Sequence, residues 1–238
     1  MDHVNVIIVG AGLSGVGAAA HLVENCPEKT FTLLEGRAAV GGTWDLFRYP
    51  GIRSDSDMHT LGYSFKPWTQ AKSIADGPSI REYVNETADE FDIRRHIRFD
   101  HKVQTASWDS AQSRWVLTST LSDGSTTAVS GDFLFMCGGY YSYDDPHRPA
   151  FPGESRYQGQ VLHPQFWPED LDYNGKKVIV IGSGATAMTI VPSMTQKGLR
   201  SPWFSARPPT WFPGPPKIKS PTLYANGFRR NGPMRLLA

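Results

Sequence analysis

Two glycine-rich segments have the composition and spacing of turns that bind dinucleotides. The first is G-A-G-L-S-G, Gly10–Gly15, and the second is G-S-G-A-T-A, Gly182–Ala187. Each follows a short apolar run, Val4–Val9 or Val178–Ile181, that is typical of a buried parallel strand. Such a turn leads from a strand into a helix whose N-terminus attracts phosphate groups. The two turns therefore predict two bound dinucleotides or one duplicated domain.

The first turn is accompanied by the other features that dinucleotide binding requires. Gly10 permits a tight turn, Gly12 lets the backbone approach a pyrophosphate, and Gly15 lets the helix and strand pack closely. Glu35 ends the next strand, F-T-L-L-E, where a carboxylate can accept hydrogen bonds from a ribose diol. In the second turn Ala187 replaces the third glycine, a position that needs only a small side chain. A tight turn without a ligand is the alternative for a single glycine pattern, and the strand, helix and acid together favour a dinucleotide site.

A long stretch from Gly36 to Asp57 combines glycine and aromatic residues with few signals of regular structure. We expect a functional loop, in which Gly41 and Gly42 let a flat ring or a phosphate approach the backbone. Trp44 and the neighbouring aromatic residues would exclude water. The alternative is a surface loop that its aromatic side chains hold in place.

The remaining patterns predict the elements that position these residues. Apolar residues recur with a helical period over 79–91, with Ser79 as the expected N-cap. Residues 96–103 and 114–121 alternate as strands, and Asp123-Gly124 predicts a hairpin turn. Asp132–Cys137 is expected to be a buried strand that returns to the main sheet. The sequence thus predicts an α/β fold, a Rossmann-like domain with a parallel sheet and an inserted small antiparallel sheet, followed by the start of a second Rossmann domain.

Composition narrows the class of partner. The 238 residues are 39% hydrophobic and 20% charged, with a net charge of +1, which is ordinary for a soluble globular protein. So small a charge does not favour nucleic acid or a membrane surface, and small molecules are the expected partners. The first apolar run is too short for a membrane span and lacks the basic leader of a signal peptide. Cys26 and Cys137 lack the spacing of a metal site or a disulfide framework, so we expect no metal and a cytoplasmic location.

A proline-rich linker, Tyr157–Pro168, lies between the two turns and reads Y-Q-G-Q-V-L-H-P-Q-F-W-P. Gly159, His163 and Trp167 match the fingerprint F-x-G-x-x-x-H-x-x-x-W-P, whose phenylalanine is replaced here by tyrosine. With G-G-T-W-D-L-F-R-Y-P-G-I-R-S-D-S-D-M at 41–58, the chain resembles the class B flavoprotein monooxygenases of the Baeyer-Villiger type. It is most similar to their ethionamide-activating group. The resemblance covers about residues 4 to 198.

This resemblance implies a flavin monooxygenase that uses FAD and NADPH. In the family NADPH reduces the flavin, and dioxygen then gives a C4a-peroxyflavin that converts a ketone to an ester or oxygenates an organosulfur compound. The implied catalytic residues are Asp55, where flavin meets nicotinamide, and His163, which is expected to couple the movements of the two domains. A linker histidine whose hydrogen bonds are satisfied is the alternative for His163.

The resemblance also assigns binding residues and domains. The implied FAD-binding residues are Gly10, Gly12, Ser14, Gly15, Glu35, Gly42, Thr43, Trp44, Asp45, Leu46 and Val103. The implied NADPH-binding residues are Arg53, Ser54, Asp55, Gly182, Ser183, Gly184, Ala185, Thr186, Ala187 and Met188. The expected domains are an FAD-binding domain at 1–150, a linker at 151–175, and the first βα unit of the NADPH-binding domain at 176–198.

The last part of the chain departs from the family pattern. From about Leu199 the strand and helix periodicity is lost, and the composition shifts to proline, glycine and arginine. Back-translation from Ser201, with free choice of third bases and each codon regrouped with the last base of the previous one, can give a family-like continuation. We therefore hypothesise a frameshift near residues 199–201. We therefore expect 199–238 to be a mostly disordered tail, and Arg207 is not assigned to the NADPH 2′-phosphate.

This departure leaves the activity of the chain open. A single strand and helix after the linker cannot bury their apolar faces as a parallel sheet. The chain is therefore expected to have little or no activity by itself, and the alternative function is a catalytically inactive, truncated nucleotide-binding fragment. A flavin disulfide reductase is disfavoured, because no cysteine pair follows the first turn.

Overall fold

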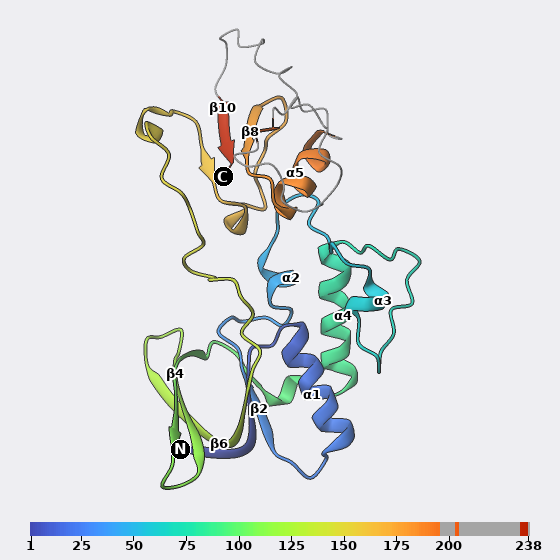
Figure 1. The fold of residues 1–238 in the computed structure, drawn as a ribbon, viewed down its shortest axis with the longest axis vertical. Helices are drawn as coiled ribbons and strands as arrows, with labels where there is room; N and C mark the ends of the chain where they lie inside the picture. The colour runs from blue at the N-terminus through green and yellow to red at the C-terminus, as the bar shows by residue number, and fades with distance from the viewer. Residues whose placement is uncertain (196–202, 205–233, 238) are drawn as a thin grey trace, which may run out of the picture. The chain divides into compact units, whose positions relative to one another are not determined.

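The computed structural model describes residues 1–195, 203–204 and 234–237 (Figure 1). The chain divides into two compact units. Unit 1 comprises Met1–Phe47 and Arg53–Asp145, and unit 2 comprises Arg48–Ile52 and Pro146–Ala238. Among the described residues, no helix is long and apolar enough to cross a membrane. The expected domain limits at 150, 175 and 198 stay predictions.

Unit 1 is built on a six-stranded sheet with the strand order β3-β2-β1-β6-β5-β4. Strands β1, β2, β3 and β6 pair in parallel, whereas β4, β5 and β6 pair antiparallel. The strand bounds are β1 Asp2–Val9, β2 Phe31–Leu34, β3 Ile97–Arg98, β4 Lys102–Asp109, β5 Arg114–Thr120 and β6 Thr126–Met136. Parallel strands joined by helical crossovers confirm the predicted α/β, Rossmann-like class.

The antiparallel strands extend the main sheet rather than forming a separate one. Strand β6 is long enough to pair with β5 through residues 126–131 and with β1 through residues 129–136. The hairpin turn predicted at Asp123-Gly124 is confirmed between β5 and β6, since Gly124 has φ +82° and Leu121 N–H donates to the carbonyl of Ser125. The antiparallel part of the fold therefore begins where the parallel part ends.

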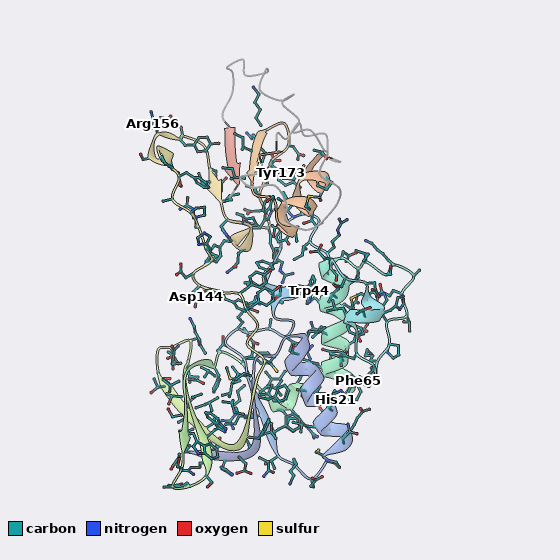
Figure 2. All side chains as sticks on the ribbon, in the orientation of Figure 1. His21, Trp44, Phe65, Asp144, Arg156 and Tyr173 are labelled. Atoms are coloured by element: carbon teal, nitrogen blue, oxygen red, sulfur yellow. The ribbon has the colours of Figure 1, made fainter. Side chains whose placement is uncertain are left out.

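The helices of unit 1 supply the apolar faces that the sheet needs. They are α1 Leu13–Asn25, α2 Thr43–Leu46, α3 Met58–Leu61, α4 Gly77–Glu90 and the 3-10 turn η1 Arg94–His96. A core cluster joins α1 and α4 to β1 and β2 through fully buried side chains such as Ile8, Val16 and Ile80. At its border the rings of His21 and Phe65, labelled in Figure 2, meet edge to face at 5.0 Å between centroids.

Two local expectations for unit 1 are wrong. Helix α4 is capped by Asp76 rather than Ser79, because the Asp76 carboxylate accepts the backbone N–H of Ser79 at 3.0 Å. The stretch 96–103, expected as one strand, is divided between β3 and β4. Asp100 between them has φ +57°, a left-handed conformation that ends the first strand.

Asp132–Cys137, expected to be a buried strand, is largely exposed. It forms the end of β6, where Phe133, Phe135 and Met136 are 56%, 45% and 63% exposed. The two phenylalanines line an apolar pocket of about 390 Å³ beside α1, together with Val6 and Ile8. Among the described residues this part of β6 thus lacks the covering layer that a buried parallel strand has.

Unit 2 contains a parallel sheet with the strand order β7-β10-β8-β9. Its elements are η2 Glu154–Arg156, β7 Val161–Leu162, η3 Pro164–Phe166, β8 Lys177–Ile181, α5 Ala185–Thr195, β9 Trp203–Phe204 and β10 Met234–Leu237. The expectation that the strand after the linker lacks neighbours is therefore wrong, because β9 and β10 pair on either side of β8. Within residues 199–238 the structure describes these two strands, and the other positions lie outside the described residues. The predicted disorder and the frameshift stay predictions.

Candidate functional site

The first glycine-rich turn is closed at Gly10 and Gly15 by backbone contacts that leave no room for a side chain. Gly10 has φ +102°, and a Cβ atom there would lie 2.5 Å from the carbonyl oxygen of Cys137. A Cβ atom on Gly15 would lie 1.9 Å from the carbonyl oxygen of Gly10, so α1 and β1 approach more closely than any larger residue allows. A Cβ atom on Gly12 would lie 3.4 Å from the Cα atom of Gly42.

The N-terminus of α1 is open to an anion. Its N-cap is Gly12, which provides no side-chain hydrogen bond, and its first turn contains no acidic residue. The first backbone N–H groups of a helix have no partner within the helix and carry its positive dipole end. Ser14 lies in this turn and is exposed. The turn can therefore donate backbone hydrogen bonds to a phosphate.

Glu35 follows the last residue of β2, and its carboxylate is held against the first turn. The side chain is 5% exposed. One carboxylate oxygen accepts the N–H of Ala11 at 2.7 Å, and the other accepts the N–H of Arg37 at 3.0 Å. Each oxygen of an ionised carboxylate can accept a further hydrogen bond. These contacts fix the acid in place and leave acceptor capacity for a hydroxyl group.

The Gly41–Leu46 loop is stacked on the first turn. Gly41 N–H donates to the carbonyl oxygen of Ala11 at 3.0 Å, and a Cβ atom on Gly42 would lie 3.0 Å from the Cα atom of Gly12. Helix α2 follows at once, with Thr43, Trp44 and Leu46 half-buried and Asp45 buried. The structure therefore brings both glycine-rich segments of unit 1, and the residues expected to bind FAD in α2, to one place.

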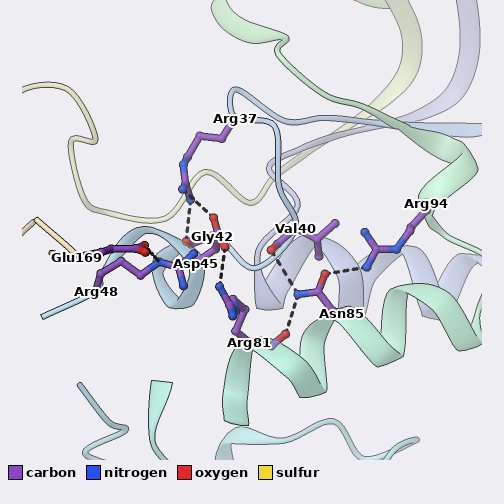
Figure 3. A network of polar contacts seen from close by, with 9 residues as sticks. All are labelled: Arg37, Val40, Gly42, Asp45, Arg48, Arg81, Asn85, Arg94 and Glu169. Carbon is purple, nitrogen blue, oxygen red and sulfur yellow. Dashed lines mark hydrogen bonds and ion pairs between the residues drawn. The ribbon is translucent and has the colours of Figure 1, made fainter. Parts of the chain in front are cut away.

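Two arginines converge on Asp45 in this loop. Arg37 Nη2 lies 2.7 Å from one carboxylate oxygen, and Arg81 Nη1 lies 3.5 Å from the other. Figure 3 shows the two guanidinium groups approaching Asp45 from opposite sides. Arg37 also donates to the carbonyl oxygen of Gly42 at 3.4 Å. The charge of this buried carboxylate is thus balanced by cations from the loop and from α4.

Sequence reasoning missed three residues of this site: Arg37, Arg81 and Tyr143. The guanidinium group of Arg37 lies 5.8 Å from the centroid of the half-buried Tyr143 ring. Burial raises the pKa of Tyr143, and a hydrogen bond with Thr43 opposes that shift. The position of Arg37, two residues after Glu35, could have marked it. No sequence signal marked Arg81 or Tyr143.

Val103 and the residues Arg53–Asp55 lie in different surroundings. Val103 is half-buried in β4, at an irregularity of the β4-β5 pairing, and the preceding Lys102 Cα atom lies 3.6 Å from the Cβ position of Gly36. Val103 therefore lies near the start of β4, close to the residues that follow β2. Arg53 is exposed, and its backbone forms an isolated antiparallel β-bridge with that of Asp76. Ser54 is buried, and its hydroxyl donates to the carbonyl oxygen of Ser56 at 2.6 Å. Asp55 between them is exposed.

The second glycine-rich turn joins β8 to α5. Gly182 has φ +145°, and its Cβ position is 3.9 Å from the Cβ atom of the buried Ala187. Gly184 has open space around its Cβ position. Ser183 and Thr186 are half-buried, whereas Ala185 and Met188 are exposed. The turn thus has the closed packing at its third small residue and the open approach at its second that the pattern predicts.

The linker histidine is held by hydrogen bonds within unit 2. His163 Nδ1 accepts the N–H of Gln165 at 3.2 Å, which caps the short helix η3. Burial lowers the pKa of His163, and a hydrogen bond with the backbone of His147 acts in the opposite direction. Trp167 is 8% exposed and meets Tyr173 edge to face at 6.1 Å. These contacts support a structural role, and coupling of domain movements stays a prediction.

The chain is similar in sequence to flavin-binding monooxygenases. The chain matches the family model described as flavin-binding monooxygenase-like over residues 3–213. It is 54% identical over 217 residues to the FAD-containing monooxygenase EthA of Mycolicibacterium smegmatis, covering 91% of this chain and 44% of that protein. It is 46% identical over 216 residues to the probable FAD-binding monooxygenase AlmA of Acinetobacter baylyi, covering 91% and 43%.

Solved structures give the same result. An oxidised steroid monooxygenase bound to NADP superposes with a TM-score of 0.71 at 34% identity, covering 82% of this chain and 37% of that one. A closed structure of cyclohexanone monooxygenase superposes with a TM-score of 0.69 at 28% identity, covering 83% and 37%. The chain spans less than half the length of the relatives it matches.

Proposed function

The chain belongs to the flavin-binding monooxygenase-like family, as its motifs predicted, and from this membership we propose that it binds FAD at Gly10–Gly15 and NADPH at Gly182–Met188. The proposed reaction is monooxygenation of a small molecule, either a ketone converted to an ester or an organosulfur compound converted to its oxide. NADPH supplies two electrons, one oxygen atom of dioxygen enters the product, and the other leaves as water. Relatives whose names contain FAD, and a related structure bound to NADP, support both cofactors.

The observation that carries the proposal is the combination of the buried Glu35 carboxylate with the uncapped start of α1. A pyrophosphate would receive backbone hydrogen bonds at Gly12 and Ser14, because α1 has neither a capping side chain nor an acid there. The Glu35 carboxylate has the acceptor capacity for a ribose diol. The residues present therefore fit an adenine dinucleotide at this turn.

The other residues of unit 1 would surround the flavin side of the same ligand. Thr43, Trp44, Asp45 and Leu46 follow the close contact between Gly42 and the first turn. At the other end of the ligand, Val103 would meet the adenine through its backbone, because β4 begins close to Gly36, which follows the end of β2. When bound, FAD supplies the chemistry that takes up electrons from NADPH and activates dioxygen. The protein contributes binding, orientation and exclusion of water.

The roles proposed outside the FAD site depend on different residues. Arg53, Ser54 and Asp55 would bind the nicotinamide half of NADPH, with Asp55 at its meeting point with the flavin. Backbone groups from Ser183 to Met188, at the start of α5, would receive the phosphates. His163 would keep the linker in place as a neutral ring, since its Nδ1 atom accepts a hydrogen bond. A cytoplasmic location, expected from the two unpaired cysteines, is part of the same proposal.

A purified sample of the 238-residue chain tests the proposal. If the proposed reaction occurs in this chain by itself, the sample will retain flavin absorbance after gel filtration and will oxidise NADPH faster when a cyclic ketone or a thioether is added. Mass spectrometry with ¹⁸O₂ should then detect one labelled oxygen atom in the product. Bound FAD without substrate-dependent oxidation would support the alternative, a nucleotide-binding fragment without turnover. Absence of FAD binding would overturn the proposal.

Paired variants locate the ligand within the chain. Gly12→Val places a branched side chain at the open backbone of the first turn and should abolish FAD binding. Gly124→Ala is the control, because Gly124 lies in the hairpin between β5 and β6 and its Cβ position has no neighbour within 4 Å. Equal FAD affinity in these two variants would contradict a site at Gly10–Gly15.

A further inference from the structure

An acid and an arginine, Glu35 and Arg37, lie close to each other just after β2, and Glu35 contacts the first turn. In dinucleotide sites an acid at this point pairs with the 2′-hydroxyl group of a ribose, whereas an arginine accommodates a 2′-phosphate. Glu35 and Arg37 are two residues apart, and the Arg37 N–H donates to the Glu35 carboxylate at 3.0 Å. A free Arg37 side chain could therefore offset the repulsion between Glu35 and a 2′-phosphate.

The Arg37 side chain, however, is drawn away by Asp45. Its Nη2 atom lies 2.7 Å from the Asp45 carboxylate, whose side chain is only 10% exposed, and its Nη1 atom donates to the carbonyl oxygen of Gly42. A charged pair at this distance and burial is stronger than an exposed one. Figure 3 shows the Arg37 side chain extended toward α2.

Arg81 makes the position of Asp45 independent of Arg37. It reaches the other carboxylate oxygen of Asp45 from α4, at 3.5 Å, so the acid is held by a second cation as well. Another cation near the end of β2, Lys102, forms an exposed ion pair with Asp144. Arg37 and Lys102 thus each have an acidic partner within unit 1.

We propose that Asp45 sets the specificity of the first turn by holding Arg37 away from the adenosine ribose. The Glu35 carboxylate is then left to face that ribose, so the turn accepts a dinucleotide with a free 2′-hydroxyl group and rejects one with a 2′-phosphate. This inference rests on the proposed function, in which one chain handles FAD and NADPH. Asp45 acts through Arg37 and is a positioning residue.

Displacement of FAD from the full 238-residue chain measures this specificity. FAD release is followed by flavin fluorescence while either AMP or adenosine 2′,5′-bisphosphate is added, two ligands that differ only in the 2′-phosphate. A ligand at the second turn does not displace FAD, so the signal reports the first turn. We expect the 2′-phosphorylated ligand to compete at least about tenfold more weakly than AMP, because its 2′-phosphate would face the negative charge of the Glu35 carboxylate.

Asp45→Ala should reduce this preference at least about fivefold by releasing Arg37 toward the 2′-phosphate. The double variant Asp45→Ala with Arg37→Gln should restore it, because the freed cation is gone. Arg81→Ala is the matched control: it removes the second arginine but leaves the pair between Arg37 and Asp45. General loosening of the loop would weaken both ligands together and leave their ratio unchanged.

The role of Asp45 and the binding of FAD by the chain are tested by different outcomes. A chain that binds FAD but keeps the wild-type preference in Asp45→Ala overturns the role of Asp45 alone, as does a double variant that fails to restore it. A wild-type chain that does not bind FAD overturns the proposed function and this inference with it. The FAD affinity of each variant, measured in the same titration, shows whether the site is folded.

Discussion

The carbonyl oxygen of Gly10 lies 1.9 Å from the point where a Cβ atom on Gly15 would stand. Gly10 follows β1 and Gly15 lies in α1, and the obstacle is a backbone oxygen, which cannot move aside as a flexible side chain would. This contact sets how closely α1 approaches the sheet, and hence where the open N-terminus of α1 lies relative to Glu35. Replacement of Gly15 should therefore affect folding and FAD binding together.

Gly15→Ala is expected to lower the free energy of unfolding by about 3 kcal/mol or more, since overpacking a rigid contact costs about 1–3 kcal/mol even where neighbours can adjust. Urea unfolding followed by circular dichroism measures the change. Gly138→Ala, with open space around the new methyl group, should stay within about 1 kcal/mol of wild type. If both variants have the wild-type stability, the close packing of α1 on β1 is wrong.

Gly51 gives a second test of backbone packing, in unit 2. It has φ +80°, and a Cβ atom there would lie 2.6 Å from the carbonyl oxygen of Thr189 and 2.8 Å from the Cβ atom of Ser193, both in α5. Gly51→Ala should cost about 1–2 kcal/mol for the left-handed conformation and about 1–3 kcal/mol more for the clash.

Gly124→Ala is the matched control for that variant. Gly124 has nearly the same conformation, φ +82°, but no atom within 4 Å of its Cβ position. It should therefore show only the conformational cost, and the difference between the two unfolding free energies isolates the contact with α5. Equal losses in both variants would show that the Arg48–Ile52 segment is not seated on α5.

The sequence was sufficient to predict the parts of the site that depend on neighbouring residues. Gly10, Gly12 and Gly15 lie in one turn between a strand and a helix, and the strand that ends at Glu35 follows directly, so pattern and topology determine their meeting. The α/β class was predictable for the same reason. Those features need no information about distant parts of the chain.

The rest of the site depends on contacts between distant residues. Arg81 reaches Asp45 from a helix 36 residues further along, and a surface-exposed face of α4 looks the same in sequence whether or not it pairs with a buried acid. The exposure of Phe133 and Phe135 was also unpredictable, because an apolar run indicates that a strand can be buried but not that anything covers it. Tertiary packing decides both.

The N-cap of α4 provides a test where local reasoning selected the wrong residue. Asp76 accepts hydrogen bonds from the N–H and the hydroxyl group of Ser79, and these bonds lower the pKa of Asp76. Asp76→Ala should lower the free energy of unfolding by about 0.5–2 kcal/mol, whereas Ser79→Ala keeps the backbone cap and should cost less. Thermal unfolding of both variants measures the difference. A larger loss in Ser79→Ala would restore Ser79 as the cap.

The ring of His163 predicts a pH dependence of stability. Burial lowers its pKa below the ordinary value of 6.5, so the folded chain favours the neutral ring, whose Nδ1 atom accepts the N–H of Gln165. The resulting stability is fully present above the unfolded pKa and is lost as the pH falls through the folded pKa. Unfolding free energies should therefore be lower at pH 5.5 than at pH 7.5, a range of about one unit on either side of 6.5.

His163→Gln should make that decrease smaller, because glutamine does not titrate but can still accept the N–H of Gln165. Part of the decrease should remain, since burial also lowers the pKa of His96 in unit 1. His96→Gln is thus the matched variant, and His163→Gln with His96→Gln should show the smallest pH dependence. NMR titration of the imidazole C–H resonances assigns the effect to each ring. A His163 resonance that titrates at or above 6.5 would contradict the buried, neutral state of the linker histidine.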